Sequence, residues 1–150
     1  MHGVVVLPGG DIVAGGIANF GKFNARFALA RYDSDGALDS AFGGDGNVTT
    51  NLTPGDDEAW DIALQPDGKV VAGGDARRKG GCFAAARYLS NGSLDPTFGS
   101  GGLAFVNFTK RDDFALALAR QSTDGNLVLA GGAGWGGSNP RFAVARLLDE

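Results

Sequence analysis

Closely spaced aspartates form the first cluster in this chain whose residue types suggest chemistry. The segment 33–39 (DSDGALD) carries Asp33, Asp35 and Asp39 around a glycine, and this resembles part of a calcium loop, in which carboxylates wrap a hard cation. The alternative is a turn that Asp and Gly organise between two strands. A second copy at 89–95 (LSNGSLD) keeps the glycine but replaces the first two aspartates by Leu and Asn. The turn chemistry therefore repeats and the charge does not, so we expect a turn, with calcium as the weaker candidate.

Two runs of acidic residues, 56–58 (DDE) and 112–113 (DD), are the next candidates. Paired carboxylates can act as a general acid and a general base. We expect both runs to lie in connections that lead into a strand, where Asp commonly organises a turn. Asp61 is the acid that we place on an inner strand. The pattern therefore predicts no catalytic residues and no enzyme.

Composition narrows the possible chemistry further. The 150 residues include one His and one Cys, which excludes a multi-His metal site, an internal Ser-His-Asp triad and an intramolecular disulfide. The net charge of −4 argues against a nucleic-acid partner. The apolar runs are too short for a membrane span, and the sequence from Met1 shows no signal peptide. We therefore predict no cofactor.

The elements that position these residues repeat along the chain. The segment 26–32 (RFALARY) returns at 82–88 (CFAAARY) and at 141–147 (RFAVARL), each time after a pair of glycines. Gly15, Gly73 and Gly131 are the first glycines of these pairs and follow one another at intervals of 58 residues. A fixed period of this size indicates a repeat architecture.

The second copy predicts four short strands, a to d, over 59–65, 69–74, 82–89 and 103–108. Pro-Asp-Gly and Asn-Gly turns separate the first three of them. Taken alone, 114–120 (FALALAR) also suits a helix, but its counterpart 59–65 (AWDIALQ) does not, which favours a strand for both.

These strands are apolar on both faces, which is typical of a sheet that is covered on both sides. A β-sandwich would explain the short strands but not the period. We predict an all-β, propeller-type arc of nearly three four-stranded blades (a-b-c-d, a-b-c-d, a-b-c) that is incomplete as a ring. The single repeat domain covers 1–150, with blade 1 at about 3–53, blade 2 at about 57–109 and a partial blade 3 at about 113–148.

The sequence Asp-x-x-Phe-Gly occurs twice, ending in Phe42-Gly43 and Phe98-Gly99. Because this motif is repeated, a functional role is one interpretation of it. The structural interpretation is stronger, because a Phe in a connecting segment can fill the space between neighbouring sheets while the Gly allows a sharp turn.

By length and motif the repeats resemble the delta-60 repeat family. The resemblance is carried by 26–50 (RFALARYDSDGALDSAFGGDGNVTT) and 55–74 (GDDEAWDIALQPDGKVVAGG), and the second copy keeps the FA-x-AR-Y and LD-x-x-FG positions. That family is regarded as bacterial β-propeller blades. The resemblance implies a large parent protein that is extracytoplasmic or at the cell surface, with non-catalytic binding or scaffold repeats, no cofactor and no catalytic residues.

The frame residues repeat, but the b-to-c loops (17–25, 75–81 and 133–140) do not. In a propeller, the b-to-c and d-to-a connections emerge on one face, and variable loops on a rigid scaffold are where binding specificity usually lies. Aromatic residues with Arg suit a protein or glycan contact. The candidate binding residues on this face are Phe20, Phe23, Arg77, Arg78, Lys79 and Trp135.

The predicted function is a non-enzymatic binding or scaffold module of a larger repeat protein that uses this loop face. One alternative is a fragment of a propeller hydrolase or lyase with a metal at the mouth of the channel; another is a purely structural spacer. Because three sheets leave apolar faces and strand edges exposed, we expect further blades of the same chain, or a homo-oligomer, to close the ring.

Overall fold

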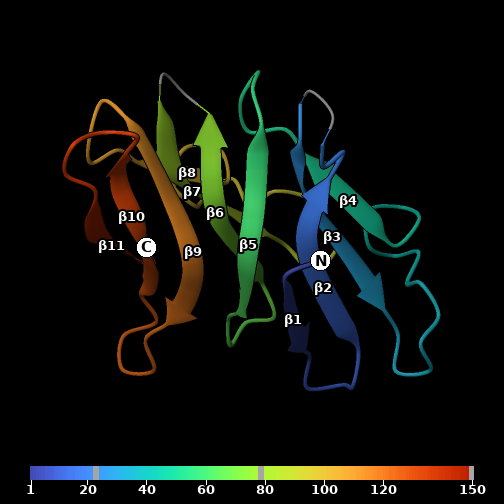
Figure 1. Ribbon diagram of the computed structural model, residues 1–150. Coiled ribbons are helices and arrows are strands. Elements are labelled where there is room, and N and C mark those ends of the chain that lie inside the picture. The colour runs from blue at the N-terminus through green and yellow to red at the C-terminus, as the bar shows by residue number, and fades with distance from the viewer. Residues whose placement is uncertain (22–23, 78–79, 149–150) are drawn as a thin grey trace.

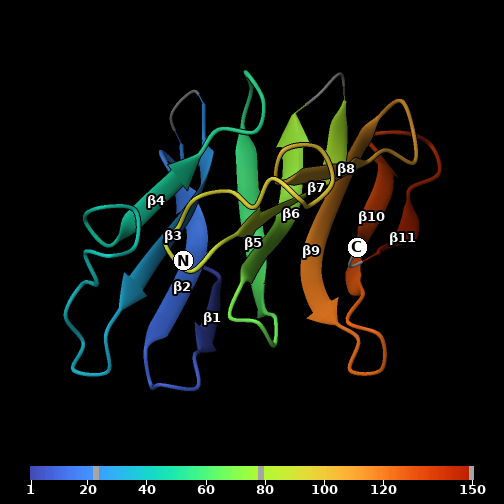
Figure 2. The ribbon, with the colours of Figure 1, turned by 180° about the vertical axis from the view of Figure 1, so that it is seen from behind.

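The computed structural model describes residues 1–21, 24–77 and 80–148. These residues form three antiparallel sheets that stand side by side with their faces together, and none of them lies in a helix (Figure 1). It follows that the described part of the chain offers no apolar helix of membrane-spanning length. The sheets follow one another in an open arc (Figure 2). The predicted all-β, propeller-type arc is confirmed.

Each sheet is a meander in which consecutive strands pair. The first sheet contains β1 (Gly3–Val6), β2 (Ile12–Ala18), β3 (Arg26–Tyr32) and β4 (Asn47–Thr50). The second contains β5 (Asp57–Leu64), β6 (Val70–Arg77), β7 (Gly81–Tyr88) and β8 (Leu103–Val106). The third contains β9 (Asp112–Arg120), β10 (Leu127–Trp135) and β11 (Arg141–Leu147). The segment 114–120 is thus strand, as expected.

Two of the predicted b-to-c loops are shorter than expected. β6 continues to Arg77, because Arg77 still pairs with Gly81 across the hairpin. β10 continues to Trp135, which pairs with Asp112 on the other side. Backbone pairing therefore extends through residues whose polar and glycine-rich sequence predicted a loop.

The second sheet is covered on both faces, as its apolar alternation predicted. Every residue of β7 is buried. Its Ala84, Ala86 and Tyr88 belong to a core shared with the first sheet, whereas Phe83 and Ala85 belong to a core shared with the third. Alternate side chains of β7 point to opposite faces of the sheet, so this one strand contributes to the interfaces with both the first and the third sheet.

Glycine lets neighbouring sheets approach closely. A Cβ atom at Gly15 would lie 2.3 Å from Cγ2 of Ile62 in the next sheet. A Cβ atom at Gly73 would likewise lie 3.0 Å from Cδ2 of Leu129 and 3.2 Å from Cβ of Leu118. A large side chain of each following sheet therefore occupies the space that a missing side chain leaves.

The two Asp-x-x-Phe-Gly segments perform the predicted structural role. Phe42 is buried between the first and second sheets and Phe98 between the second and third. The backbone N–H of Gly43 also donates to the carbonyl of Asn91, which ties the first segment to the next sheet.

The evenly spaced glycines do not occupy equivalent positions in the third sheet. The turn between β5 and β6 is closed by Gln65 N–H donating to the Lys69 carbonyl, whereas the corresponding bond in the third sheet spans from Gln121 to Asn126. Within β10 the glycine pair also lies one residue further along the strand than it does in β6. Gly73 pairs with Ala85, and the matching partner of Val144 is Ala130 rather than Gly131. Structural equivalence therefore follows the FA-x-AR motif and not the glycine interval.

Loss of the buried ring at the second interface should be costly. Phe83→Ala removes a fully buried side chain, and we expect it to lower the free energy of unfolding by about 3–5 kcal/mol. Urea unfolding followed by circular dichroism would measure this loss. Phe20→Ala is the matched control, because Phe20 is 70% exposed and should change stability by less than about 0.5 kcal/mol. Equal losses in the two variants would contradict the assigned packing.

Candidate binding groove

A groove of about 380 Å³ opens between the second and third sheets, beside the b-to-c and d-to-a connections. Its volume falls within the range of small-ligand sites. We name it the interblade groove. It is lined by Glu58, Trp60, Asp75, Arg77, Gly81, Asp112, Asp113, Phe114, Leu116 and Trp135.

The wall formed by the second sheet carries an aromatic and charged set. Glu58 of β5 lies directly opposite Asp75 of β6 in the antiparallel register. A register shift between Ala59 and Asp61 accommodates Trp60 as an extra residue. The indole Nε1–H of Trp60 donates to Oδ1 of Asp75 at 2.8 Å. The strand pairing thus fixes two acids and an indole at one edge of the groove.

Asp75 has the most strongly displaced pKa on this wall. Burial raises the pKa of its carboxyl to about 7, and the negative charge of Glu58 adds to the increase. The hydrogen bond from Trp60 and the positive charge of Arg77 act in the opposite direction without cancelling it. Asp75 therefore changes charge near neutral pH, inside a groove of ligand size.

The wall formed by the third sheet carries two aromatic rings beside Asp112, Asp113 and Leu116. The rings of Phe114 on β9 and Trp135 on β10 meet edge to face, with centroids 5.5 Å apart at 81°. Trp135 remains more than half exposed. This ring is therefore held in place by Phe114 and still presents an accessible surface to a ligand.

Buried aspartates at the start of β5 and β9 hold the loop face together. Oδ2 of Asp57 accepts backbone bonds from Leu52 and Thr53, and its Oδ1 accepts the Thr53 hydroxyl. Asp113 makes the same set with Phe108 and Thr109 and gains one more bond from the backbone N–H of Gly134. These carboxylates organise the d-to-a connections, as the sequence predicted.

The two aspartates nevertheless differ in pKa. Burial raises the pKa of Asp57 above its ordinary value, and the hydrogen bonds from Thr53 offset only part of this rise. Burial also raises the pKa of Asp113, but the bonds from Gly134, Thr109 and Phe108 outweigh it and leave the pKa below its ordinary value. The bond from Gly134 lowers the pKa of Asp113, and the charge of Asp56 raises the pKa of Asp57, so both contribute to the difference.

The remaining residues of the acidic runs join the loops of neighbouring hairpins. Oδ1 of Asp56 accepts the backbone N–H groups of Asn24 and Ala25, both at 2.9 Å. Oδ1 of Asp112 accepts the backbone N–H of Gly81 at 3.0 Å. The bonds of Asp56 join a d-to-a connection to a b-to-c connection, and the bond of Asp112 joins the first residues of β9 and β7, which follow such connections. The two kinds of connection therefore lie at the same edge of the sheets, as predicted.

The structure brings two of the predicted binding residues together. Arg77 and Trp135 line the interblade groove from opposite sheets. Phe20 is exposed in the loop after β2 and does not line that groove. Phe23, Arg78 and Lys79 lie outside the described residues.

The calcium candidate segment forms the alternative turn. Oδ1 of Asp33 accepts the backbone N–H groups of Asp35 and Ala37. Asp39 accepts the backbone N–H of Ala41 and forms an ion pair with Arg31 at 3.0 Å. Over the ranges that the structure describes, no three His, Cys, Asp or Glu side chains are grouped as metal ligands would be.

Several groove residues were not among the sequence candidates. Asp75 was assigned to a polar loop, and Trp60 and Phe114 to strands without a function. One signal in the sequence was that the chain has two tryptophans, Trp60 and Trp135, and both of them line the groove. They come to the same groove because two sheets stack on each other, and the spacing of residues within one repeat does not predict this stacking.

Repeated four-stranded meanders stacked face to face define a β-propeller-type repeat protein. Among models of protein families, the one described as "Domain of unknown function (DUF5122) beta-propeller" matches residues 8–42, 65–98 and 122–148. These ranges cover more than half of the chain, so the chain belongs to this family. No curated protein matches it.

The raised pKa of Asp75 predicts a pH dependence of stability. The folded protein retains the Asp75 proton up to about pH 7, whereas the unfolded chain releases it near the ordinary pKa of 3.8. The free energy of unfolding therefore decreases between these two pH values on account of this group. Asp75→Asn should remove the decrease, so its stability relative to the unmodified chain should increase with pH until about 7. Thermal unfolding across this range measures the difference.

Asp124→Asn is the control for this experiment. Desolvation acts to raise the pKa of Asp124, but hydrogen bonds from Asn126 and the charge of Arg146 hold it below the ordinary value. The stability difference for Asp124→Asn should therefore stay constant where that for Asp75→Asn changes. A constant difference for Asp75→Asn would show that its carboxyl titrates normally.

Proposed function

We propose that this chain is a non-enzymatic binding module of a larger repeat protein and that its ligand, a glycan or a protein segment, enters the interblade groove. The observation that carries the proposal is the convergence of Arg77 and Trp135 from two sheets on one groove of ligand size. An accessible indole offers apolar area at little entropic cost, and the guanidinium and the carboxylates offer directed hydrogen bonds. This combination is typical of surfaces that carry binding energy.

The state of the carboxylates favours binding over catalysis. Asp57 and Asp113 are buried and engaged by backbone and hydroxyl donors. The inner-strand acid Asp61 accepts the backbone N–H groups of Ile62 and Leu118, both at 2.9 Å. These groups hold connections and sheets in place, so we assign them no role in acid–base chemistry.

Two finer parts of the proposal rest on resemblance alone. We propose that these repeats are delta-60 repeats and that the parent protein is bacterial and acts outside the cytoplasm or at the cell surface. The length of the repeat and the recurring FA-x-AR and LD-x-x-FG positions support this assignment.

The groove carries its own optical probe. The chain contains two tryptophans, and both line the interblade groove. Intrinsic fluorescence should therefore change when glycans or peptides from a panel bind there. Arg77→Ala combined with Trp135→Ala should weaken binding at least about tenfold, since residues of this kind contribute more than 1 kcal/mol each at binding hot spots.

Phe20→Ala is the control variant, because Phe20 lies on the same loop face outside the groove. Its affinity for the same ligand should be unchanged. If the double variant bound every ligand as the unmodified chain does, the groove assignment would be wrong and the structural spacer would be the better description. Stoichiometric metal in the purified protein, found by elemental analysis, would instead favour the hydrolase or lyase alternative.

A further inference from the structure

The two ends of the arc expose residues whose counterparts are buried inside it. Phe27, Phe83 and Phe142 occupy the same position of the repeated FA-x-AR motif. Phe27 and Phe83 are 0% exposed, because the following sheet covers each of them. Phe142 points away from the second sheet and is 78% exposed. The outer face of the third sheet is therefore built like an internal interface but has no sheet upon it within the described residues.

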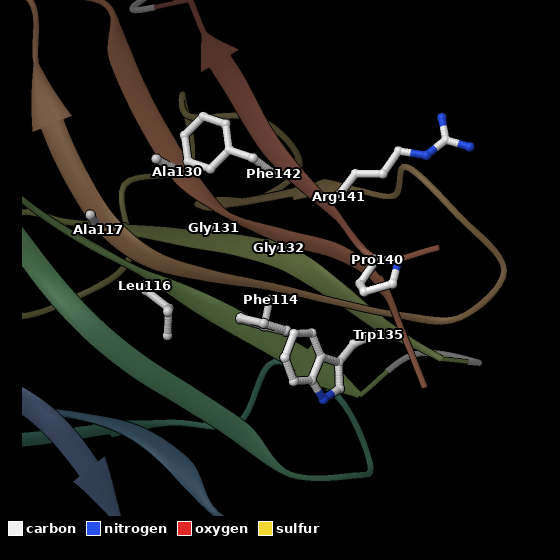
Figure 3. Close-up of a pocket in the computed structure, with 10 residues that line it drawn as sticks. All are labelled: Phe114, Leu116, Ala117, Ala130, Gly131, Gly132, Trp135, Pro140, Arg141 and Phe142. Carbon is white, nitrogen blue, oxygen red and sulfur yellow. The ribbon is translucent and has the colours of Figure 1, made fainter. Parts of the chain in front are cut away.

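This outer face is a broad apolar surface. A hollow of about 650 Å³ runs along it between Phe142, Leu116 and Trp135, with Ala130 at its floor (Figure 3). Leu116, which lines the hollow, and Val144, which lies on the same face, are both exposed. An apolar surface of this kind is typical of a site that another protein surface covers.

The outer face of the first sheet has the complementary character. A hollow of about 320 Å³ is lined there by small residues, including Ala14, Gly16, Ala28 and Ala30. Val4 and Val6 of β1 project from the same face and are both more than 60% exposed. The equivalent face of the second sheet, with Ala72, Gly74, Ala84 and Ala86, is the one that covers the first sheet.

We propose that a second copy of this chain places the outer face of its first sheet on the outer face of the third sheet, in the manner in which the second sheet covers the first. The contact is head to tail. Since each copy carries one face of each kind, two copies make two such contacts and close a ring. With three sheets described in each copy, the ring lies within the usual range of four to eight blades.

Side-chain volumes at the centre of the contact fit this arrangement. Inside the chain, Ile62 packs where Gly15 has no side chain, and Leu118 and Leu129 together pack where Gly73 has none. By strand register, the matching residues of the end faces are Val4 and Ala130. Val4, which projects from β1, is one methylene smaller than Ile62. Ala130, which lies where Gly15 and Gly73 lie in their sheets, is one methyl group larger than glycine. Val4 and Ala130 together therefore carry the same number of side-chain carbons as Ile62 and Gly15, so the docked contact can pack as closely as the contact between the first and second sheets.

The outer strand of the first sheet gives a second, independent fit. In the second sheet, Leu103 and Phe105 of β8 pack into the core shared with the first sheet. The residues in register with them on β4 are Asn47 and Thr49. The third sheet has no fourth strand in the described part of the chain, so β4 of a docked copy would have nothing to cover. Asn47 and Thr49 are polar, which suits a strand that this arrangement would leave exposed to water.

Solution mass tests the proposal directly. Sedimentation or light scattering should give about twice the 15.3 kDa of one chain at micromolar concentration. Phe142→Asp should yield a folded monomer, because this side chain is exposed within a single copy. Phe20→Asp is the matched control and should remain a dimer, because Phe20 lies in a loop away from both end faces.

A size exchange tests the docking geometry itself. Ala130→Val should weaken the dimer about tenfold through overpacking against Val4 of the second copy. Adding Val4→Ala should restore the affinity, because the pair regains its original number of carbons. Both changes lie on faces that are open in one copy, so each variant should fold, which circular dichroism verifies.

Three results would overturn the proposal. The first is a monomer at every concentration tested. The second is a mass that increases continuously with concentration, which indicates an open filament instead of a closed pair. The third is failure of Val4→Ala to restore the dimer of Ala130→Val. Ligand binding in the interblade groove is measured separately, by fluorescence of the monomeric Phe142→Asp variant, so the two proposals can fail independently.

Discussion

The closeness of approach between neighbouring sheets is the constraint on which the rest of the structure depends. Gly15 and Gly73 leave space that side chains such as Ile62 and Leu118 fill, so at each of the two interfaces one sheet presents a bare backbone and the next sheet presents branched side chains. This asymmetry explains why the strands are apolar on both faces and why small and large residues alternate in them. It also gives the stack a direction, because the two faces of a sheet are not interchangeable.

A set of aspartates organises the loops at one edge of the sheets, next to the interblade groove. Asp57 and Asp113 gather the chain that leads into β5 and β9, and Asp56 and Asp112 bond to the hairpin loops beside them. The connections on one edge are thus held by charge-assisted bonds and not by apolar packing. The core and the groove consequently depend on different chemistry, and changes in the groove need not disturb the stack.

Much of the architecture could be predicted from the sequence because the motifs that specify the strands and turns are repeated along the chain. The FA-x-AR motif and the Asp-x-x-Phe-Gly segments occur at matching places, so comparing copies separated frame residues from variable ones. The groove was predicted only in part. Arg77 and Trp135 were recognised as loop-face residues, but Asp75 was not, because its buried environment arises from pairing with Glu58 and from the indole of Trp60. Contacts that depend on strand extension and on a neighbouring sheet leave no periodic signal in the chain.

The position of the glycine pair in β10 has a consequence for how the repeats of such a chain can recombine. Repeats that arise by duplication can recombine freely only while their registers agree. Because Val144 pairs with Ala130 and not with Gly131, a crossover guided by the glycine pairs would shift one strand by a residue and turn its core face to water. Ala130 carries a Cβ at the position of Gly15 and Gly73 because, within the described residues, no following sheet packs against it as Ile62 and Leu118 pack against those glycines.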